Sequence, residues 1–147
     1  VDIAETLQKQ VDDTVQKGAI VLVEGGRSDK GSSFAPMVLG NVKPGMPAYH
    51  EELFGPVAIL FRFTTIEDAL RLANDTVYGL CASVWTVNKK LAAEISSKLN
   101  VGYVAINNMV VSDPRLPFGG VKRSGFGREL GDEGLLEFVN LKTVFGA

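Results

Sequence analysis

Residues 57–107 have the sequence VAILFRFTTIEDALRLANDTVYGLCASVWTVNKKLAAEISSKLNVGYVAIN. Three short apolar runs within it, at 57–63, 80–86 and 101–107, are separated by segments whose apolar residues have helical spacing. Strand, helix, strand, helix, strand with short links is typical of a right-handed βαβαβ unit with parallel strands. The sequence therefore predicts an α/β fold built on a parallel sheet.

Both helices of this stretch begin with a recognisable capping residue. Thr65 can cap the first helix, and Asp68 stands three positions later, as in a capping box. Asn88 can cap the second helix. The inner faces are expected to consist of Ile66, Ala69, Leu70 and Ala73 in the first helix, and of Leu91, Ala92, Ile95 and Leu99 in the second.

The first 42 residues predict one helix and two strands. Ile3, Leu7, Val11 and Val15 recur every four residues, which indicates one face of a helix that Gly18 ends. The continuous apolar run at 19–23 is typical of a strand covered on both faces in a parallel sheet. Residues 24–33 are polar and rich in Gly and Ser, so we expect a loop. A weaker strand is expected at 34–42, limited by Pro36.

Composition excludes several classes of protein. The 147 residues have a formal net charge of −2, which argues against a nucleic-acid partner. No apolar run is long enough for a transmembrane helix, so no membrane partner is expected. The single cysteine, Cys81, excludes an internal disulfide and favours a cytoplasmic, reducing compartment. Cys81 and the single histidine, His50, cannot form a structural zinc site, and we expect no metal.

The first candidate for chemistry is EELFGPV at 51–57. In an extended segment side chains alternate, so Glu52 and Phe54 are expected to point to the same side. A carboxylate and a ring so placed could hold a pair of sugar hydroxyls and stack on the attached base, and Gly55 would allow close approach. The alternative is a solvated acidic turn that leads into a core strand.

The second candidate is the glycine-rich segment PFGGVKRSGFGRE at 117–129. It matches neither the dinucleotide fingerprint nor the phosphate-binding P-loop, because its glycine spacing is wrong for both. A long structured loop in a compact domain is nevertheless often functional. The alternative is a loop packed on the sheet, with Arg128 and Glu129 in structural ion pairs.

The remaining reactive residue types favour structural roles. We expect Cys81 to be a small core residue, because its strand neighbours are apolar and no cation is adjacent. His50 is expected to be an exposed imidazole, and Trp85 a core residue on its strand. Ser112 and Asp113 lack a nearby histidine, so a Ser-His-Asp triad has little support.

Four motifs together resemble the aldehyde dehydrogenase superfamily. These are EELFGPV at 51–57, ANDTVYGL at 73–80, PFGGVKRSGFGRE at 117–129 and KTV at 142–144, in the order and spacing of that family. The resemblance covers essentially the whole chain and is to the C-terminal third of such an enzyme. It implies oxidation of an aldehyde to an acid with NAD or NADP, through a cysteine thioester that a glutamate-activated water hydrolyses.

The resemblance also implies roles for particular residues. Glu52 matches the glutamate that holds the nicotinamide ribose, and Phe54 the aromatic residue beside the nicotinamide ring. Phe118 matches the pocket aromatic residue near the reacting carbon, and residues 109–116 match the loop that shapes the substrate entrance.

The sequence SDPRLPFGG at 112–120 resembles most closely the NAD-preferring bacterial succinate-semialdehyde dehydrogenases. Ser112 and Arg115 could bind a substrate carboxylate at the pocket mouth. The alternative is that Arg115 is simply a surface residue.

This sequence lacks several residues that the family's chemistry requires. The family's nucleophilic cysteine, general-base glutamate, oxyanion-hole asparagine and cofactor-binding domain would lie upstream, so no catalytic residue is expected here and the chain alone should be inactive.

Residues 1–138 resemble the C-terminal portion of the catalytic domain. Residues 139–147 resemble the family's oligomerisation strand, which implies a homo-oligomer. The alternatives are a stand-alone binding or assembly module without catalysis, or another reaction of the superfamily such as acyl-phosphate or acyl-CoA reduction.

Overall fold

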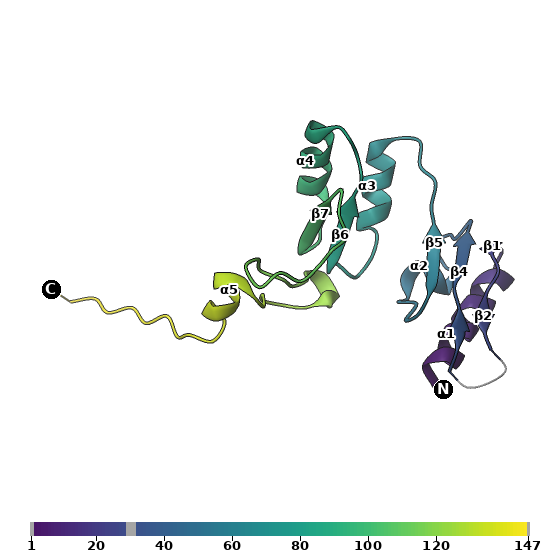
Figure 1. The fold of residues 1–147 in the computed structure, drawn as a ribbon, viewed down its shortest axis with the longest axis horizontal. Helices are drawn as coiled ribbons and strands as arrows, with labels where there is room; N and C mark the ends of the chain where they lie inside the picture. Colours follow the sequence, from purple (N-terminus) through teal and green to yellow (C-terminus); the bar gives the residue numbers. More distant parts are fainter. Residues whose placement is uncertain (1, 29–31, 147) are drawn as a thin grey trace. The chain divides into compact units, whose positions relative to one another are not determined.

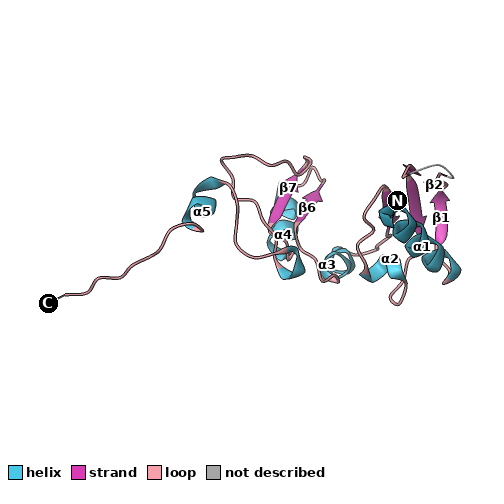
Figure 2. Cartoon of the chain, turned by 90° about the horizontal axis from the view of Figure 1, so that it is seen from below, coloured by secondary structure: helices cyan, strands magenta, loops and turns pink. Residues whose placement is uncertain are grey.

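The computed structural model describes residues 2–28 and 32–146, which form two compact units, Val1–Phe63 and Thr64–Ala147 (Figures 1 and 2). The helices are α1 (Asp2–Gln16), α2 (Pro47–His50), α3 (Ile66–Asn74), α4 (Lys89–Lys98) and α5 (Gly131–Leu136), with a 3-10 turn at Lys122–Ser124. The strands are β1 (Ile20–Val23), β2 (Gly26–Arg27), β3 (Phe34–Ala35), β4 (Met37–Gly40), β5 (Val57–Leu60), β6 (Cys81–Val84) and β7 (Tyr103–Ile106).

The first unit is a three-stranded sheet covered on one face. β4 lies in the middle, antiparallel to β1 and parallel to β5. The apolar face of α1 packs against the short helix α2 and the sheet, and the buried cluster here includes Val11, Leu39 and Met46. The helix expected in the first 17 residues is confirmed, and Gly18 follows it with a positive φ of 104°. The short helix α2, at Pro47–His50, is not predicted by the sequence pattern.

One prediction for the strands of this unit is wrong. The run at 19–23 is not covered on both faces in a parallel pair: β1 is antiparallel to β4, and Ile20, Leu22 and Val23 are about half exposed. Strand structure is present within 34–42 as predicted, and Pro36 divides it into β3 and β4, of which β4 is the most buried strand of the three-stranded sheet. The open face carries a cavity of about 430 Å³ lined by Ile20, Leu22, Leu60 and neighbours.

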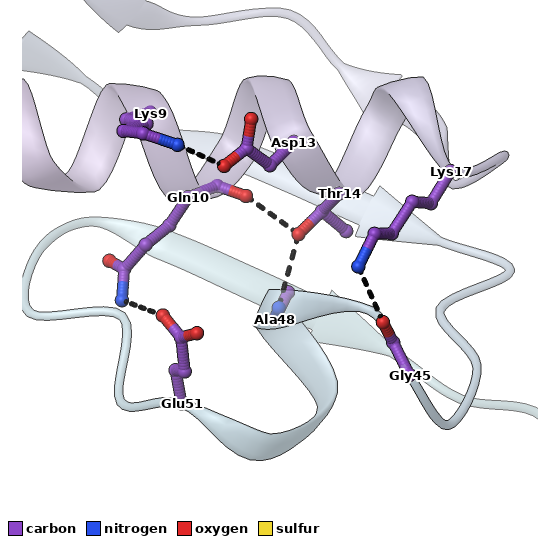
Figure 3. Close-up of polar contacts among 8 residues, drawn as sticks. All are labelled: Lys9, Gln10, Asp13, Thr14, Lys17, Gly45, Ala48 and Glu51. Atoms are coloured by element: carbon purple, nitrogen blue, oxygen red, sulfur yellow. Dashed lines mark hydrogen bonds and ion pairs between the residues drawn. The ribbon is translucent and has the colours of Figure 1, made fainter.

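Polar contacts attach α1 to the segment around α2, as Figure 3 shows. Thr14 is completely buried, and its hydroxyl donates to the Gln10 carbonyl oxygen at 2.6 Å while accepting from the Ala48 N–H at 3.1 Å. Lys17 Nζ donates to the Gly45 carbonyl at 2.8 Å. The helix therefore meets the α2 segment through a buried hydroxyl in its last turn and a charged group just beyond its end.

The second unit contains a βαβ crossover. β6 and β7 are parallel in the register Cys81↔Tyr103, and α4 connects them and packs on β6. The predicted capping is confirmed: Thr65 Oγ1 accepts from the Asp68 N–H, and Asn88 Oδ1 accepts from two amides of the first turn of α4. The predicted continuous βαβαβ sheet is not formed, because β5 pairs with β4 and not with β6.

The C-terminal segment differs from the prediction. The short helix α5 precedes it, and residues 139–146, where the oligomerisation strand is expected, form no strand. Their side chains have little cover: Leu141 is 92% exposed and Phe145 is 96% exposed. A strand needs a neighbour for its backbone hydrogen bonds, and no described segment of the chain pairs with this one. No helix in the described part of the chain is long and apolar enough to cross a membrane.

Candidate cofactor and substrate site

Glu52 and Phe54 line one cavity of about 370 Å³ in the first unit. The backbone is extended at Glu51 directly after α2, with φ −99° and ψ 152°, which starts the alternation that the sequence predicted. The other wall of the cavity belongs to α1. It consists of Ile3, Thr6, Leu7 and Gln10, which share one helix face because they are three or four residues apart.

The two neighbouring glutamates are in different situations. Glu51 accepts a hydrogen bond from Gln10 Nε2 at 2.8 Å (Figure 3), and the same nitrogen lies 3.3 Å from the Glu52 carbonyl oxygen. The Glu52 carboxylate has no hydrogen bond or ion pair with any residue that the structure describes, and it is exposed. Phe54 is 69% exposed. Gln10 therefore holds the backbone while a carboxylate and an aromatic ring remain available to a ligand.

Gly55 is required by the close approach of this segment to α1. A Cβ atom at this position would lie 2.4 Å from Leu7 Cδ2. The close approach of a ligand expected at Gly55 is a separate matter and stays a prediction.

The glycine-rich segment is closed by a short antiparallel bridge. The Phe118 N–H donates to the Glu129 carbonyl at 2.7 Å, and the Glu129 N–H donates back at 2.8 Å. The Phe118 ring meets the Tyr103 ring edge to face, with centroids 6.2 Å apart. Arg128 Nη1 donates to the carbonyls of Gly120 and Gly127 at 2.9 and 2.6 Å. The ion pair considered for Arg128 and Glu129 is replaced by this binding of Arg128 to backbone oxygens.

Two of the sequence motifs hold each other in place. Lys122 Nζ donates to the carbonyls of Asn74 and Thr76 at 3.0 and 3.1 Å, and the Gly79 N–H donates to Ser124 Oγ at 2.9 Å. The Asn74 side chain in turn bridges the Lys98 carbonyl and the Asn100 N–H. These contacts are structural, and they fix the loop that carries Phe118 to the crossover unit.

The residues predicted for the substrate pocket are not all brought together. Phe118 lines a cavity of about 430 Å³ with Ser124, Arg128 and Glu137, and neither Ser112 nor Arg115 is part of its lining. The Ser112 hydroxyl is exposed and has no partner among the described residues. Arg115 forms a two-point ion pair with Asp113. Hydrogen bonds from the Arg115 side chain and its backbone N–H lower the pKa of Asp113 to about 2.

The side chains of His50, Cys81 and Trp85 are all exposed. His50 is exposed as expected, and its Nε2 accepts from the Gly45 N–H at 3.0 Å. Cys81 and Trp85 are not core residues: Cys81 is exposed and Trp85 is 66% exposed. The prediction assumed a covered sheet, whereas among the described strands β6 pairs with β7 alone. The described residues contain no group of His, Cys, Asp and Glu that could hold a metal ion.

Gln10 and Thr6 were missed as site residues. Their signal in the sequence is the helical spacing that places them with Ile3 and Leu7, and it becomes informative only once the cavity is known to lie on α1.

Comparison with known proteins gives consistent relatives. The model of the aldehyde dehydrogenase family matches residues 2–144. A probable NADP(+) succinate-semialdehyde dehydrogenase of Synechocystis sp. is 47% identical over 145 residues, covering 98% of this chain and 32% of that protein. The succinate semialdehyde dehydrogenase Sad of Escherichia coli K12, named for NAD(P)+, is 44% identical over 145 residues, 98% of this chain and 31% of that protein.

Solved structures agree. A betaine aldehyde dehydrogenase from Staphylococcus aureus in complex with NAD+ has a TM-score of 0.87 and 37% identity, over 94% of this chain and 28% of that one. A structure described as giving insights into cofactor and substrate selection by Gox0499 has a TM-score of 0.92 and 36% identity. The match covers 99% of this chain and 32% of that one. The chain thus spans about a third of the length of the relatives that it matches. The names of these two succinate-semialdehyde relatives specify NADP(+) or NAD(P)+ and not the NAD-preferring kind that the sequence resembled.

Proposed function

This chain belongs to the aldehyde dehydrogenase family, and from that premise we propose that it contributes the nicotinamide-facing and substrate-entrance residues of an NAD(P)-dependent enzyme that oxidises succinate semialdehyde. The observation that carries the proposal is the cavity shared by Glu52 and Phe54, with the Glu52 carboxylate unpaired among the described residues. The succinate-semialdehyde relatives support the choice of substrate.

The groups that line the cavity suit a nicotinamide ribose. An ionised carboxylate accepts two hydroxyl hydrogen bonds, which are short and strong because the acceptor is charged. The exposed Phe54 ring offers a flat apolar surface beside it, and Gln10 and Thr6 add polar groups on the opposite wall. When bound, the cofactor supplies the hydride acceptor. The part of Glu52 and Phe54 is to orient it.

We propose that the substrate entrance is formed by residues 109–116 together with Phe118 and Ser112. An exposed hydroxyl with no intramolecular partner can donate to a substrate carboxylate. The Phe118 ring, fixed by its edge-to-face contact with Tyr103, provides an apolar wall for the carbon chain.

The division of labour follows from the family resemblance. We propose that residues 1–138 are a C-terminal portion of the catalytic domain and that residues 139–147 pair with another subunit. The exposed apolar side chains of the tail, among them Phe138, Leu141, Val144 and Phe145, support this role. Cys81 lies on a strand and is not proposed as the nucleophile. An exposed free thiol also suits a cytoplasmic location.

The test replaces the matching third of the E. coli relative with this chain and measures aldehyde-dependent reduction of NADP+ and NAD+. We expect the chimera to oxidise succinate semialdehyde, while the 147-residue chain by itself produces no reduced cofactor. A chimera with the thermal stability of the parent enzyme and no dehydrogenase activity would contradict the proposal. Turnover by the isolated chain would contradict the assignment of the nucleophile to another part of the protein.

A further inference from the structure

The Asp113 carboxylate accepts three hydrogen bonds from a single residue, Arg115. Oδ1 accepts from both the Arg115 N–H and Arg115 Nε at 2.9 Å, and Oδ2 accepts from Arg115 Nη2 at 2.6 Å. The Asp113 side chain is 27% exposed, whereas that of Arg115 is 85% exposed. The guanidinium therefore covers the carboxylate from the solvent side, and both residues are committed to one tight turn.

This turn is attached to the rest of the second unit. The Leu116 N–H donates to the Asp113 carbonyl at 3.0 Å, and the Gly131 N–H at the start of α5 donates to the Pro114 carbonyl at 3.1 Å. A Cβ atom on Gly131 would lie 3.0 Å from the Pro117 nitrogen. The chain between Ser112 and Phe118 is thus fixed at both its centre and its end.

The pairing changes what Arg115 can offer to a substrate. The ion pair of Arg115 and Asp113 has no net charge to attract a second carboxylate, and an incoming acid would be repelled by the nearby negative charge of Asp113. Arg115 lines none of the three cavities described above. Its position fits a support for the loop better than a group that receives the substrate.

We propose that Arg115 is a positioning residue: paired with Asp113, it fixes the turn that follows Ser112 at the substrate entrance, and it does not bind the substrate carboxylate itself. This inference rests on the proposed function.

The experiment uses the chimera with the E. coli relative and compares Asp113→Asn, Arg115→Ala and the double variant, with Lys90→Ala as the control for loss of an exposed cation. We expect each single variant to raise KM for succinate semialdehyde by about threefold to fivefold, as suits an exposed pair, with kcat nearly unchanged. The double variant should be no worse than either single one, because both remove the same interaction.

If Arg115 instead binds the substrate carboxylate directly, the expected change in KM is different for Asp113→Asn. If the guanidinium receives the substrate, Asp113→Asn frees it, and KM falls or stays constant while Arg115→Ala raises it. That result overturns the proposal, as does an unchanged KM in both single variants. An unsubstituted chimera that does not oxidise succinate semialdehyde would contradict the proposed function. It would also contradict the role of Arg115 in positioning the entrance for that substrate.

The pair is also measured without activity, by a carboxyl NMR titration of the full chain. The pKa of Asp113 is lowered to about 2 by its bonds to Arg115, so pairing is complete above the ordinary value of about 4 and is lost as the pH falls through 2. In Arg115→Ala we expect this pKa to return to its ordinary value, while Lys90→Ala leaves it unchanged. An equally low pKa in Arg115→Ala would show that another group holds the carboxylate, and would overturn the pairing.

Discussion

At the scale of single residues, the described part of the chain separates groups that are occupied from groups that are free. Thr14, Asp113 and Arg128 have their polar atoms bound within the protein, whereas the Glu52 carboxylate is unpaired among the described residues. Bound groups of this kind carry stability or position a loop. Free and exposed groups on a cavity wall are available for recognition.

Thr14 provides a test of the buried hydroxyl. In Thr14→Val the Ala48 N–H loses its acceptor in a buried place, so we expect the free energy of unfolding of the first unit to fall by about 1–3 kcal/mol. Thr14→Ser keeps the hydroxyl and loses one methyl group, for a cost of about 1 kcal/mol. Urea unfolding of the full chain measures both. Equal stability of the Val variant and the parent chain would show that Ala48 finds another partner.

At the scale of elements, close backbone crossings hold the second unit together. Gly102, just before β7, lies against the backbone of Gly119. A Cβ atom on Gly102 would be only 1.7 Å from the Gly119 carbonyl oxygen. The loop that carries Phe118 can therefore reach the crossover unit only if position 102 has no side chain.

Gly102→Ala is expected to separate these two segments. Such overpacking typically costs about 1–3 kcal/mol, and the loss should appear as a lower Tm of the full chain. Gly146→Ala is the matched control, because a Cβ atom there would meet nothing within 4 Å. A Gly102→Ala variant as stable as Gly146→Ala would mean that the crossing relaxes freely.

Local signals in the sequence predicted local structure. The caps at Thr65 and Asn88 depend on atoms within three residues, and both were found. That Glu52 and Phe54 share one side follows from the alternation of side chains along an extended segment, whereas the α1 wall of their cavity does not. Interactions between distant residues were not accessible in the same way. Nothing local tells β5 to pair with β4, or Lys122 to reach the carbonyl of Asn74.

Burial was the least predictable property. Trp85 and Cys81 have the neighbours of core residues, yet burial depends on what covers their strand, and that information is not in the strand. Arg115 shows a related limit: its pairing with Asp113 is local, but a pattern of residue types cannot tell a pair from two independent ligands.

At the scale of the whole molecule, the chain spans about a third of the length of the relatives that it matches, and its apolar tail pairs with no described strand. Such a segment favours association through its backbone edge and apolar side chains. The proposed homo-oligomer depends on this tail.

Leu141→Asp tests the tail, because the side chain is 92% exposed and its loss should not unfold the chain. We expect sedimentation of the full chain to show weaker self-association. Val87→Asp introduces the same change at an equally exposed apolar position outside the tail and should have no such effect. Identical association of the two variants would contradict the role of the tail.

The central claim is that Glu52 orients a nicotinamide cofactor, and its most direct test is the chimera with Glu52→Gln beside Glu51→Gln. The two substitutions are chemically identical and one residue apart, but only Glu52 lines the cavity, while Glu51 accepts from Gln10. Loss of the charge on the ribose-binding group is expected to reduce kcat/KM for the cofactor about tenfold or more in Glu52→Gln and to leave Glu51→Gln within about twofold of the unsubstituted chimera. Equal kinetics of the two variants would contradict the claim.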